Sequence, residues 1–149
     1  MSSIVDVLYE LKYNPFQYGP YLASFYSSLG ESENNIILSS LVIPLCSHPT
    51  FGLKLFNSNK NSTLWTIFGE RASLYDLQER VDAFKTLTEQ CIHYCLINEW
   101  ISINEQALSV RALNNVHASF GMQKSAEKLG KLLYGHSVVE IYSFFGVKP

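Results

Sequence analysis

The residues best suited to metal binding are Cys91, His93 and Cys95, which place two thiols and an imidazole close together in sequence. Thiolate sulfur and imidazole nitrogen are the ligands that structural zinc prefers. On a helix, residues four apart share a face, whereas a residue two positions along points to roughly the opposite side. We therefore expect Cys91 and Cys95 to be small core residues and His93 to be exposed, with no metal or other cofactor bound.

The cysteines could instead act as nucleophiles if a histidine lay beside one of them. The candidate bases are His48, His117 and His136, and such pairs meet only in the folded chain. No motif of a cysteine enzyme family surrounds any thiol, and the apolar neighbours of Cys46 disfavour its thiolate. The sequence leaves such a pair open but favours structural cysteines and no catalytic residue.

Two further kinds of active site lack the pattern that they need. A phosphate-binding loop uses clustered glycines so that backbone N–H groups can approach the anion, and the eight glycines here are scattered singly. The acidic pairs Glu31 with Glu33, and Asp76 with Glu79, lie in polar stretches of mixed charge, not in apolar surroundings that would raise a carboxyl pKa. We interpret them as solvated surface.

Composition excludes some partners and favours others. Eleven Lys and Arg residues against thirteen Asp and Glu give a net charge of −2, without a block of like charge. Neither nucleic acid nor an anionic membrane is therefore indicated as a direct partner. Charged residues make up only 16% of the chain, apolar residues 47% and aromatic residues 13%. Such a composition favours an apolar surface that contacts other proteins.

The three cysteines and the start of the chain indicate a compartment. The cysteine count is odd, and Met-Ser-Ser-Ile-Val-Asp lacks the basic and apolar regions of a signal peptide. The longest strongly apolar stretch, Ile36 to Cys46, is about half the ~20 residues needed to cross a bilayer. We expect a reduced, cytoplasmic setting without membrane contact.

Residues 1–149 are predicted to form one mainly α-helical, compact domain. After Asn14-Pro15, apolar residues from Tyr18 to Leu29 follow helical spacing, and Gly30 can end that helix.

The next segments alternate between apolar and polar character. Ile36 to Cys46 is apolar nearly all round, which predicts a central buried helix that is interrupted at Pro44 and Pro49. Phe51 to Asn61 is predicted to be a polar turn, after which Ser62 or Thr63 caps a short helix.

A helical stripe followed by a hairpin is predicted in the second half. From Leu77 to Cys95, residues that are alternately four and three positions apart fall on one helical stripe. A break near Thr86 to Thr88 is expected to divide this segment into two helices. Trp100 to Ile103 and Ala107 to Val110 alternate like strands around a turn. A helix pair followed by a hairpin is the order at the end of a winged helix-turn-helix, which makes the domain winged-helix-like.

Two more helices are predicted at the end of the chain. Ala126, Leu129, Leu132 and Leu133 indicate one helix, and apolar residues from Val138 to Phe145 indicate another, which Gly146 ends.

The alternative function is that of a winged-helix DNA-binding or transcription regulatory module. Its reading helix would carry only Arg80 and Lys85 as cations, among the acidic residues Glu79, Asp82 and Glu89. Such a helix repels a phosphate backbone, so protein contact is the favoured interpretation.

Short motifs with Pro or Gly follow one another along most of the chain. They are Asn14-Pro15, Pro44-Leu45 with His48-Pro49-Thr50, Ser62-Thr63-Leu64-Trp65 before Phe68 and Arg71, and Leu129-Gly130 leading through Val138 and Ile141 to Phe145-Gly146-Val147-Lys148-Pro149. In this order they resemble the middle component of three-component ABC systems (ABC-3C), which includes the small middle subunit of Lamassu-type anti-phage defence complexes. Where the pattern has a basic residue after Pro49-Thr50, this chain has Phe51 and Gly52, so no contact of that residue is carried over.

The resemblance implies an adaptor subunit that is not an enzyme. It would lie beside an SMC- or Rad50-like ATPase and link it to an effector, often a nuclease, in a complex that senses foreign DNA. DNA would then be met only indirectly, through the complex.

Aromatic and basic residues are the candidate partner interface, because ring anchors contribute most of the binding energy at protein interfaces. Tyr9 and Tyr13 are further ring candidates, and Phe144 lies about one helical position off the apolar stripe of its helix. The predicted interface residues are Phe16, Lys54, Lys60, Tyr142, Phe144 and Lys148.

Overall fold

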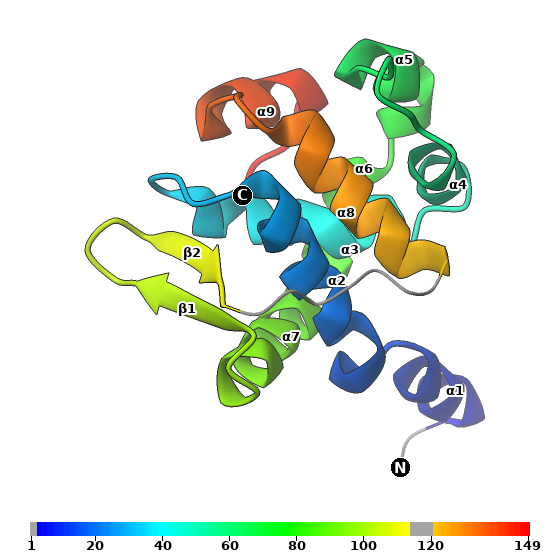
Figure 1. Cartoon of the computed structure of the whole chain (residues 1–149). Helices are drawn as coiled ribbons and strands as arrows, with labels where there is room; N and C mark the ends of the chain where they lie inside the picture. Colours follow the sequence, from blue (N-terminus) through cyan, green and yellow to red (C-terminus); the bar gives the residue numbers. More distant parts are fainter. Residues whose placement is uncertain (1–2, 114–120) are drawn as a thin grey trace.

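Helices make up most of the chain, and a two-stranded hairpin projects from one side of them (Figure 1). The computed structural model describes residues 3–113 and 121–149, with the backbone alone at residues 9–11 and 121–122. The predicted fold class, mainly α with a small hairpin, is confirmed. In chain order the elements are α1 (Ile4–Lys12), α2 (Pro15–Leu29), the 3-10 helix η1 (Asn35–Leu38), α3 (Ser39–Cys46), α4 (Phe51–Phe56), α5 (Leu64–Phe68), the 3-10 helix η2 (Arg71–Leu74), α6 (Leu77–Ala83), α7 (Lys85–Ile97), β1 (Ile101–Asn104), β2 (Ser109–Ala112), α8 (Gly121–Leu133) and α9 (Val138–Phe145).

Helix α2 begins and ends where its capping residues predict. Asn14 is extended (φ −122°), and its side-chain oxygen accepts a hydrogen bond from Gln17 N–H at 2.9 Å. Pro15 takes the first helical position, where no N–H is needed. Gly30 follows the helix with φ +80°, a value that residues with a side chain rarely adopt. The predicted first long helix is confirmed.

Helix α3 is the central buried helix that the sequence predicts, but Pro44 does not interrupt it. All of its residues except Ser40 are buried. A proline inside a helix lacks the N–H that would donate to the preceding turn. The Pro44 carbonyl, near the end of the helix, accepts hydrogen bonds from Nε and Nη2 of Arg80, both at 3.2 Å. Packing on all sides keeps the helix continuous to Cys46. The start of the predicted helix, residues 36–38, is the 3-10 helix η1 instead.

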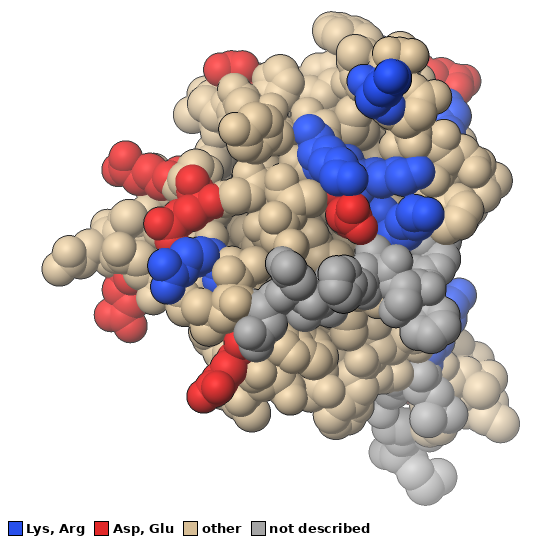
Figure 2. Space-filling view, in the orientation of Figure 1, with Lys and Arg blue, Asp and Glu red and all other residues tan. Residues whose placement is uncertain are grey.

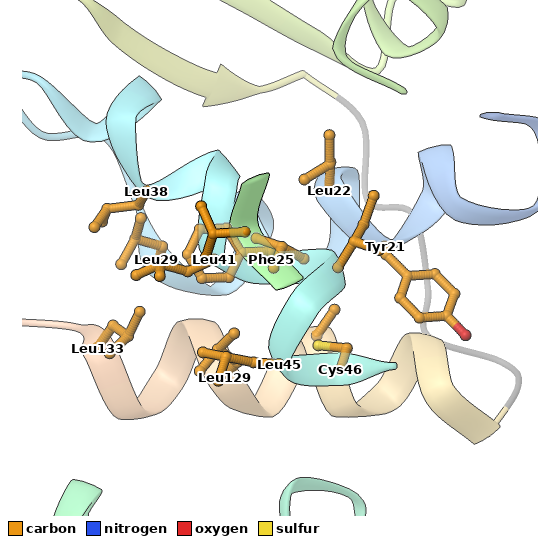
Figure 3. Close-up of a cluster of buried hydrophobic side chains, with 14 of the residues drawn as sticks. Tyr21, Leu22, Phe25, Leu29, Leu38, Leu41, Leu45, Cys46, Leu129 and Leu133 are labelled. Carbon is orange, nitrogen blue, oxygen red and sulfur yellow. The ribbon is translucent and has the colours of Figure 1, made fainter. Parts of the chain in front are cut away.

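The core lies between α2, α3 and α8 (Figure 3). Helices α2 and α8 approach closely at Gly130, where an added Cβ would lie 2.5 Å from the Phe25 carbonyl oxygen. At the same crossing Ser28 Oγ donates to the Glu127 carbonyl at 2.6 Å. Figure 3 labels side chains of this core: Tyr21, Leu22, Phe25, Leu29, Leu38, Leu41, Leu45, Cys46, Leu129 and Leu133.

The predicted polar turn at 51–61 is wrong in its first half, which forms helix α4. His48 Nδ1 accepts hydrogen bonds from the N–H groups of Thr50 (3.1 Å) and Phe51 (3.3 Å), and so starts the helix. Phe51 and Leu55, one turn apart, are fully buried, and packing on α8 makes this segment helical despite its polar residues. The next helix, α5, is capped by Thr63 in a reciprocal capping box, as predicted.

The break between α6 and α7 falls at Phe84, two residues before the predicted position. Phe84 is buried and non-helical (φ −95°, ψ 5°), and Thr88 lies inside α7. The two helices are therefore confirmed, with a shifted boundary.

The hairpin is also confirmed, although its second strand lies two residues later than predicted. Strands β1 and β2 pair in antiparallel fashion, with Ile103 opposite Val110. Asn104 Oδ1 accepts hydrogen bonds from the N–H groups of Gln106 (3.0 Å) and Ala107 (3.2 Å), which makes the turn longer. The hairpin follows α7 directly, in the order on which the winged-helix comparison was based.

Helices α8 and α9 match the two predicted C-terminal helices. Ser137 caps α9 by accepting from Glu140 N–H at 3.1 Å, and Gly146 ends it with φ +69°. Helix α1, which the sequence patterns did not predict, lies at the end of the molecule opposite α9 (Figure 1). Among the described residues, no helix is both long enough and apolar enough to cross a membrane.

Candidate functional site

The cysteines and His93 lie as the structural interpretation predicts. Cys91 and Cys95 are fully buried, whereas His93 is exposed. Burial raises the pKa of both thiols to about 12, and Cys95 Sγ donates to the Gly19 carbonyl at 3.1 Å. Within the described residues, no three His, Cys, Asp or Glu side chains come together as metal ligands. These thiols are packing groups in the folded chain.

The two candidate histidine bases that the structure describes have other partners. His48 caps α4, and burial lowers its pKa. His136 is exposed and pairs with Glu140 one turn later, at 3.5 Å, and His117 lies outside the described residues. Cys46, the nearest thiol to His48 in sequence, is fully buried, which raises its pKa well above the ordinary thiol value.

The two cations of the alternative DNA-reading helix are separated in the structure. Arg80, on α6, directs its guanidinium to the Pro44 carbonyl and to Ser47 Oγ, the latter at 2.8 Å. Lys85 is exposed at the first position of α7. Arg80 therefore contacts its own chain and is not free to contact phosphate.

The predicted N-terminal ring anchors differ in exposure. The Phe16 side chain is 70% exposed and meets Tyr94 edge to face, with ring centroids 5.2 Å apart. Tyr13 is half-buried and packs edge to face on Phe84 at 5.2 Å. The side chain of Tyr9 lies outside the described residues. A role of the exposed Phe16 in partner binding stays a prediction, whereas Tyr13, just before α2, packs on Phe84 at the junction of α6 and α7.

Tyr142 and Phe144 both pack against the rest of the chain. Tyr142 is buried, its hydroxyl donates to the Ile37 carbonyl at 2.6 Å, and burial raises its pKa to about 12. Phe144 is half-buried and meets Trp65 edge to face at 5.0 Å. The Arg71 guanidinium lies 4.9 Å from the Phe144 ring centroid and donates to the Phe144 carbonyl. These contacts dock α9 on the α5 to η2 segment, and a role in partner binding stays a prediction for both rings.

Lys148 lies in a tethered C-terminal tail. Its backbone N–H donates to Gln78 Oε1 at 2.7 Å, and Gln78 Nε2 donates back to the Lys148 carbonyl at 3.2 Å. The residue itself is exposed beside α6, so its position fits the predicted role in partner contact without testing it.

Lys54 and Lys60 belong to a larger basic cluster that the sequence reasoning missed. Helix α4, which carries Lys54, packs on α8, and Lys60 lines a hollow together with two lysines of α8. Figure 2 shows basic side chains gathered on this side of the molecule. The α8 lysines lie at i, i+4 and i+7, a spacing that could have identified one basic helix face. They are Lys124, Lys128 and Lys131.

Helix α1 is the second feature that was missed. Ser3 Oγ accepts from Asp6 N–H, and Asp6 Oδ2 accepts from Ser3 N–H, which starts the helix with a reciprocal cap. Four of its apolar residues are exposed, by 44–76%. The apolar residues at the start of the chain could have predicted the helix. Their spacing alone does not reveal that their side chains are exposed in the folded chain. The four residues are Ile4, Val5, Val7 and Leu8.

Comparison with known proteins links the whole chain to one family. The family model described as ABC-three component (ABC-3C) system Middle Component 3 matches residues 2–149. No curated protein and no solved structure matches the chain.

Proposed function

The chain belongs to the Middle Component 3 family of ABC-three component systems, and we propose that it is an adaptor without chemistry of its own. It joins an SMC- or Rad50-like ATPase to an effector of the nuclease type. The complex acts in the cytoplasm against phage or other foreign DNA, as in Lamassu-type defence. Membership of a family named for the middle one of three components supports the presence of further subunits.

The observation that carries this proposal is the uncovered apolar face of α1. A nine-residue helix is marginal in water unless its apolar face packs on something. Here the described apolar side chains from Ile4 to Leu8 are all exposed, and burial of an aliphatic side chain contributes about 1.5–3 kcal/mol. A partner subunit that covers this face would stabilise both the helix and the complex.

A second surface at the other end of the molecule supports bridging in particular. Trp65 on α5 is 66% exposed, and α5 contacts α4, which carries Lys54 of the lysine cluster. Figure 1 shows α1 at one end and α4, α5 and α9 at the other. Two subunits could therefore bind without competing for the same residues.

The buried, proton-bearing thiols support a role without catalysis. Burial raises the pKa of Cys91 and Cys95 to about 12 and also raises the pKa of Cys46, which leaves almost no thiolate at neutral pH. Chemistry in the complex is therefore assigned to the ATPase and the effector.

The test is co-expression of the chain with the ATPase and effector subunits of its system, followed by affinity purification. The double variant Ile4→Asp/Leu8→Asp should lose one subunit and retain the other, with an unchanged melting temperature because both side chains are exposed. The matched control is Ile97→Asp, which alters a 67% exposed apolar residue at the end of α7 and should retain both subunits.

Two outcomes contradict the proposal at different levels. If the double variant retains both subunits, α1 is not the bridging surface. If the unaltered chain purifies with neither subunit, the adaptor role itself is wrong.

A further inference from the structure

Two adjoining hollows lie on either side of the turn between α4 and α5. Ser58 and Ser62 line both of them. One hollow has a volume of about 250 Å³ and is lined by Lys60, Lys128 and Lys131. The other has a volume of about 600 Å³ and has a more apolar lining. Together they form a continuous surface, which we call the lysine groove.

The charge of the lysine groove is strongly positive, although the whole chain carries −2. Five of the eleven Lys and Arg residues of the chain lie on α4, on α8 or on the turn after α4. Among the described residues, the only ion pair found there joins Lys131 to Glu127 at 3.0 Å. Figure 2 shows the basic residues gathered over this side, while acidic residues lie mainly toward the hairpin. The five are Lys54, Lys60, Lys124, Lys128 and Lys131, and all of them except Lys124 line the groove.

Lys128 holds part of this charge in a fixed position. Its Nζ donates to the carbonyls of Phe56 at 2.6 Å and Ser58 at 2.7 Å, at the end of α4. It also lies 5.9 Å from the Phe56 ring centroid. An ammonium has three protons, so one remains for a ligand in the groove. The cation is therefore preorganised and needs little further ordering on binding.

The second hollow provides an apolar counterpart. Leu53 is 59% exposed on α4, and Pro49 and Ile67 form further apolar lining, with Lys54 at the same hollow. An apolar side chain could be covered here while a charged neighbour reaches the lysines. The groove thus pairs apolar contact with positive charge.

We propose that the lysine groove binds an acidic segment of a partner protein, in which an apolar side chain stands next to two or more carboxylates. This deepens the proposed adaptor function and rests on it, because it gives the chemistry by which one subunit is recognised. Carboxylates complement the lysines, and the apolar side chain covers Leu53.

The apolar hollow favours a protein over nucleic acid. A phosphate backbone would satisfy the lysines but has no side chain to cover Leu53. Strong duplex binding also uses about 6–10 phosphate contacts, whereas four lysines line the two hollows. No described aromatic residue lines either hollow as a stacking platform for bases.

The test compares two groove variants with a charge-matched control in the assembled complex and in binding assays with each purified subunit. Lys60→Glu/Lys131→Glu reverses two of the positive charges, and Leu53→Asp removes the apolar contact. Both variants should weaken binding of one and the same subunit by about tenfold or more. The control Lys85→Glu/Arg111→Glu makes the same charge change at exposed residues outside the groove and should stay within about twofold.

A photo-crosslinker at position 53 then identifies the segment that is bound. The crosslinked peptide should contain at least two Asp or Glu residues within about one helical turn, 3.6 residues, of an apolar one. Binding should also weaken as salt rises from about 50 to about 200 mM, because the lysines contribute through charge.

Each contrary outcome has a distinct meaning. If the complex assembles and the groove variants bind like the control, this inference fails while the adaptor function stands. A crosslink to a segment without carboxylates overturns it too. Binding of a short DNA duplex by the isolated chain, lost in Lys60→Glu/Lys131→Glu, would assign the groove to nucleic acid instead. Failure of the unaltered chain to bind either subunit overturns both proposals.

Discussion

Asn35 and Val110 exchange two hydrogen bonds across the interior. Val110 N–H donates to Asn35 Oδ1 at 2.6 Å, and Asn35 Nδ2 donates to the Val110 carbonyl at 3.0 Å. The amide side chain offers the same donor and acceptor as a peptide group, so it pairs with β2 as a neighbouring strand would. Backbone bonds from Asn34 to Ala107 and from Ile36 to Leu108 extend this pairing. The hairpin is thereby attached to the core.

Substitution of Asn35 should destabilise the chain strongly. Asn35→Ala leaves the N–H and the carbonyl of Val110 buried without these partners, and each such loss costs about 1–3 kcal/mol. Urea unfolding should show a decrease of about 2–5 kcal/mol in the free energy of unfolding. The control Asn57→Ala, at an exposed position after α4, should change it by less than about 0.5 kcal/mol. Equal effects of the two variants would show that the pairing adds nothing.

Such long-range contacts explain which parts of the fold could be predicted from the sequence. The boundaries of α2 and α9 could be predicted because the residues that set them are local in sequence. Asn14-Pro15 begins α2 and Gly30 ends it, and Gly146 ends α9. Helix α4 was missed because its burial depends on α8, which lies far away in sequence. Because polar residues such as Lys54 lie between Phe51 and Leu55, the helical spacing of these two apolar residues was not recognised.

The candidate site was predictable to a similar degree. Lys54 and Lys60 were singled out, but the α8 lysines that join them come from a segment about 70 residues later, as the Lys128 contact with Ser58 shows. Phe144 was expected at an interface because it lies off the apolar stripe. Its contacts with Trp65 and Arg71 arise only from folding.

The close approach of α2 and α8 should make Gly130 intolerant of a side chain. A Cβ there would lie 2.1 Å from Ser28 Oγ and 2.5 Å from the Phe25 carbonyl oxygen, and backbone cannot rotate away. Overpacking of this kind costs about 1–3 kcal/mol, although Ala favours a helix over Gly by about 1 kcal/mol. Gly130→Ala should therefore lower the melting temperature, and the exposed control Lys131→Ala should hardly move it. A rise with Gly130→Ala would show that the helices are further apart.

His48 should make stability depend on pH. Burial and the nearby Arg80 lower its pKa below the ordinary 6.5, and Asp76 opposes this. The folded chain favours the neutral His48 ring. The contribution of this ring to the free energy of unfolding is therefore complete above pH 6.5 and is lost as the pH falls through the lowered pKa. Unfolding in urea at a series of pH values should show declining stability in that acidic range. In His48→Asn the decline should be shallower, whereas in the exposed control His93→Asn it should persist unchanged.

The thiols should be unreactive while the chain is folded. Burial raises the pKa of Cys91 and Cys95 from the ordinary 9.0 to about 12, so an alkylating reagent should modify them only through unfolding. Their contribution to stability is present below pH 9 and decreases as pH rises toward 12, since the unfolded chain ionises first. Mass spectrometry after alkylation at pH 8, with and without urea, measures this protection. Rapid alkylation without urea would contradict the burial.

Phe144 should stabilise the docking of α9. Removal of the ring in Phe144→Ala abolishes its edge-to-face contact with Trp65, and such a pair contributes about 0.5–1.5 kcal/mol beyond its burial. The melting temperature should fall, whereas Val139→Ala, at a 75% exposed residue of the same helix, should leave it nearly unchanged. If Phe144→Ala instead weakens partner binding with no loss of stability, the ring acts at the interface and not in the fold.

The adaptor role makes the recovery of one subunit depend on this chain. With an affinity tag on the ATPase, the effector should be recovered in the presence of the chain and should be absent when the chain is omitted from the co-expression. Quantitative mass spectrometry of the purified material measures this dependence. Equal recovery of the effector with and without the chain would contradict the role of a bridge.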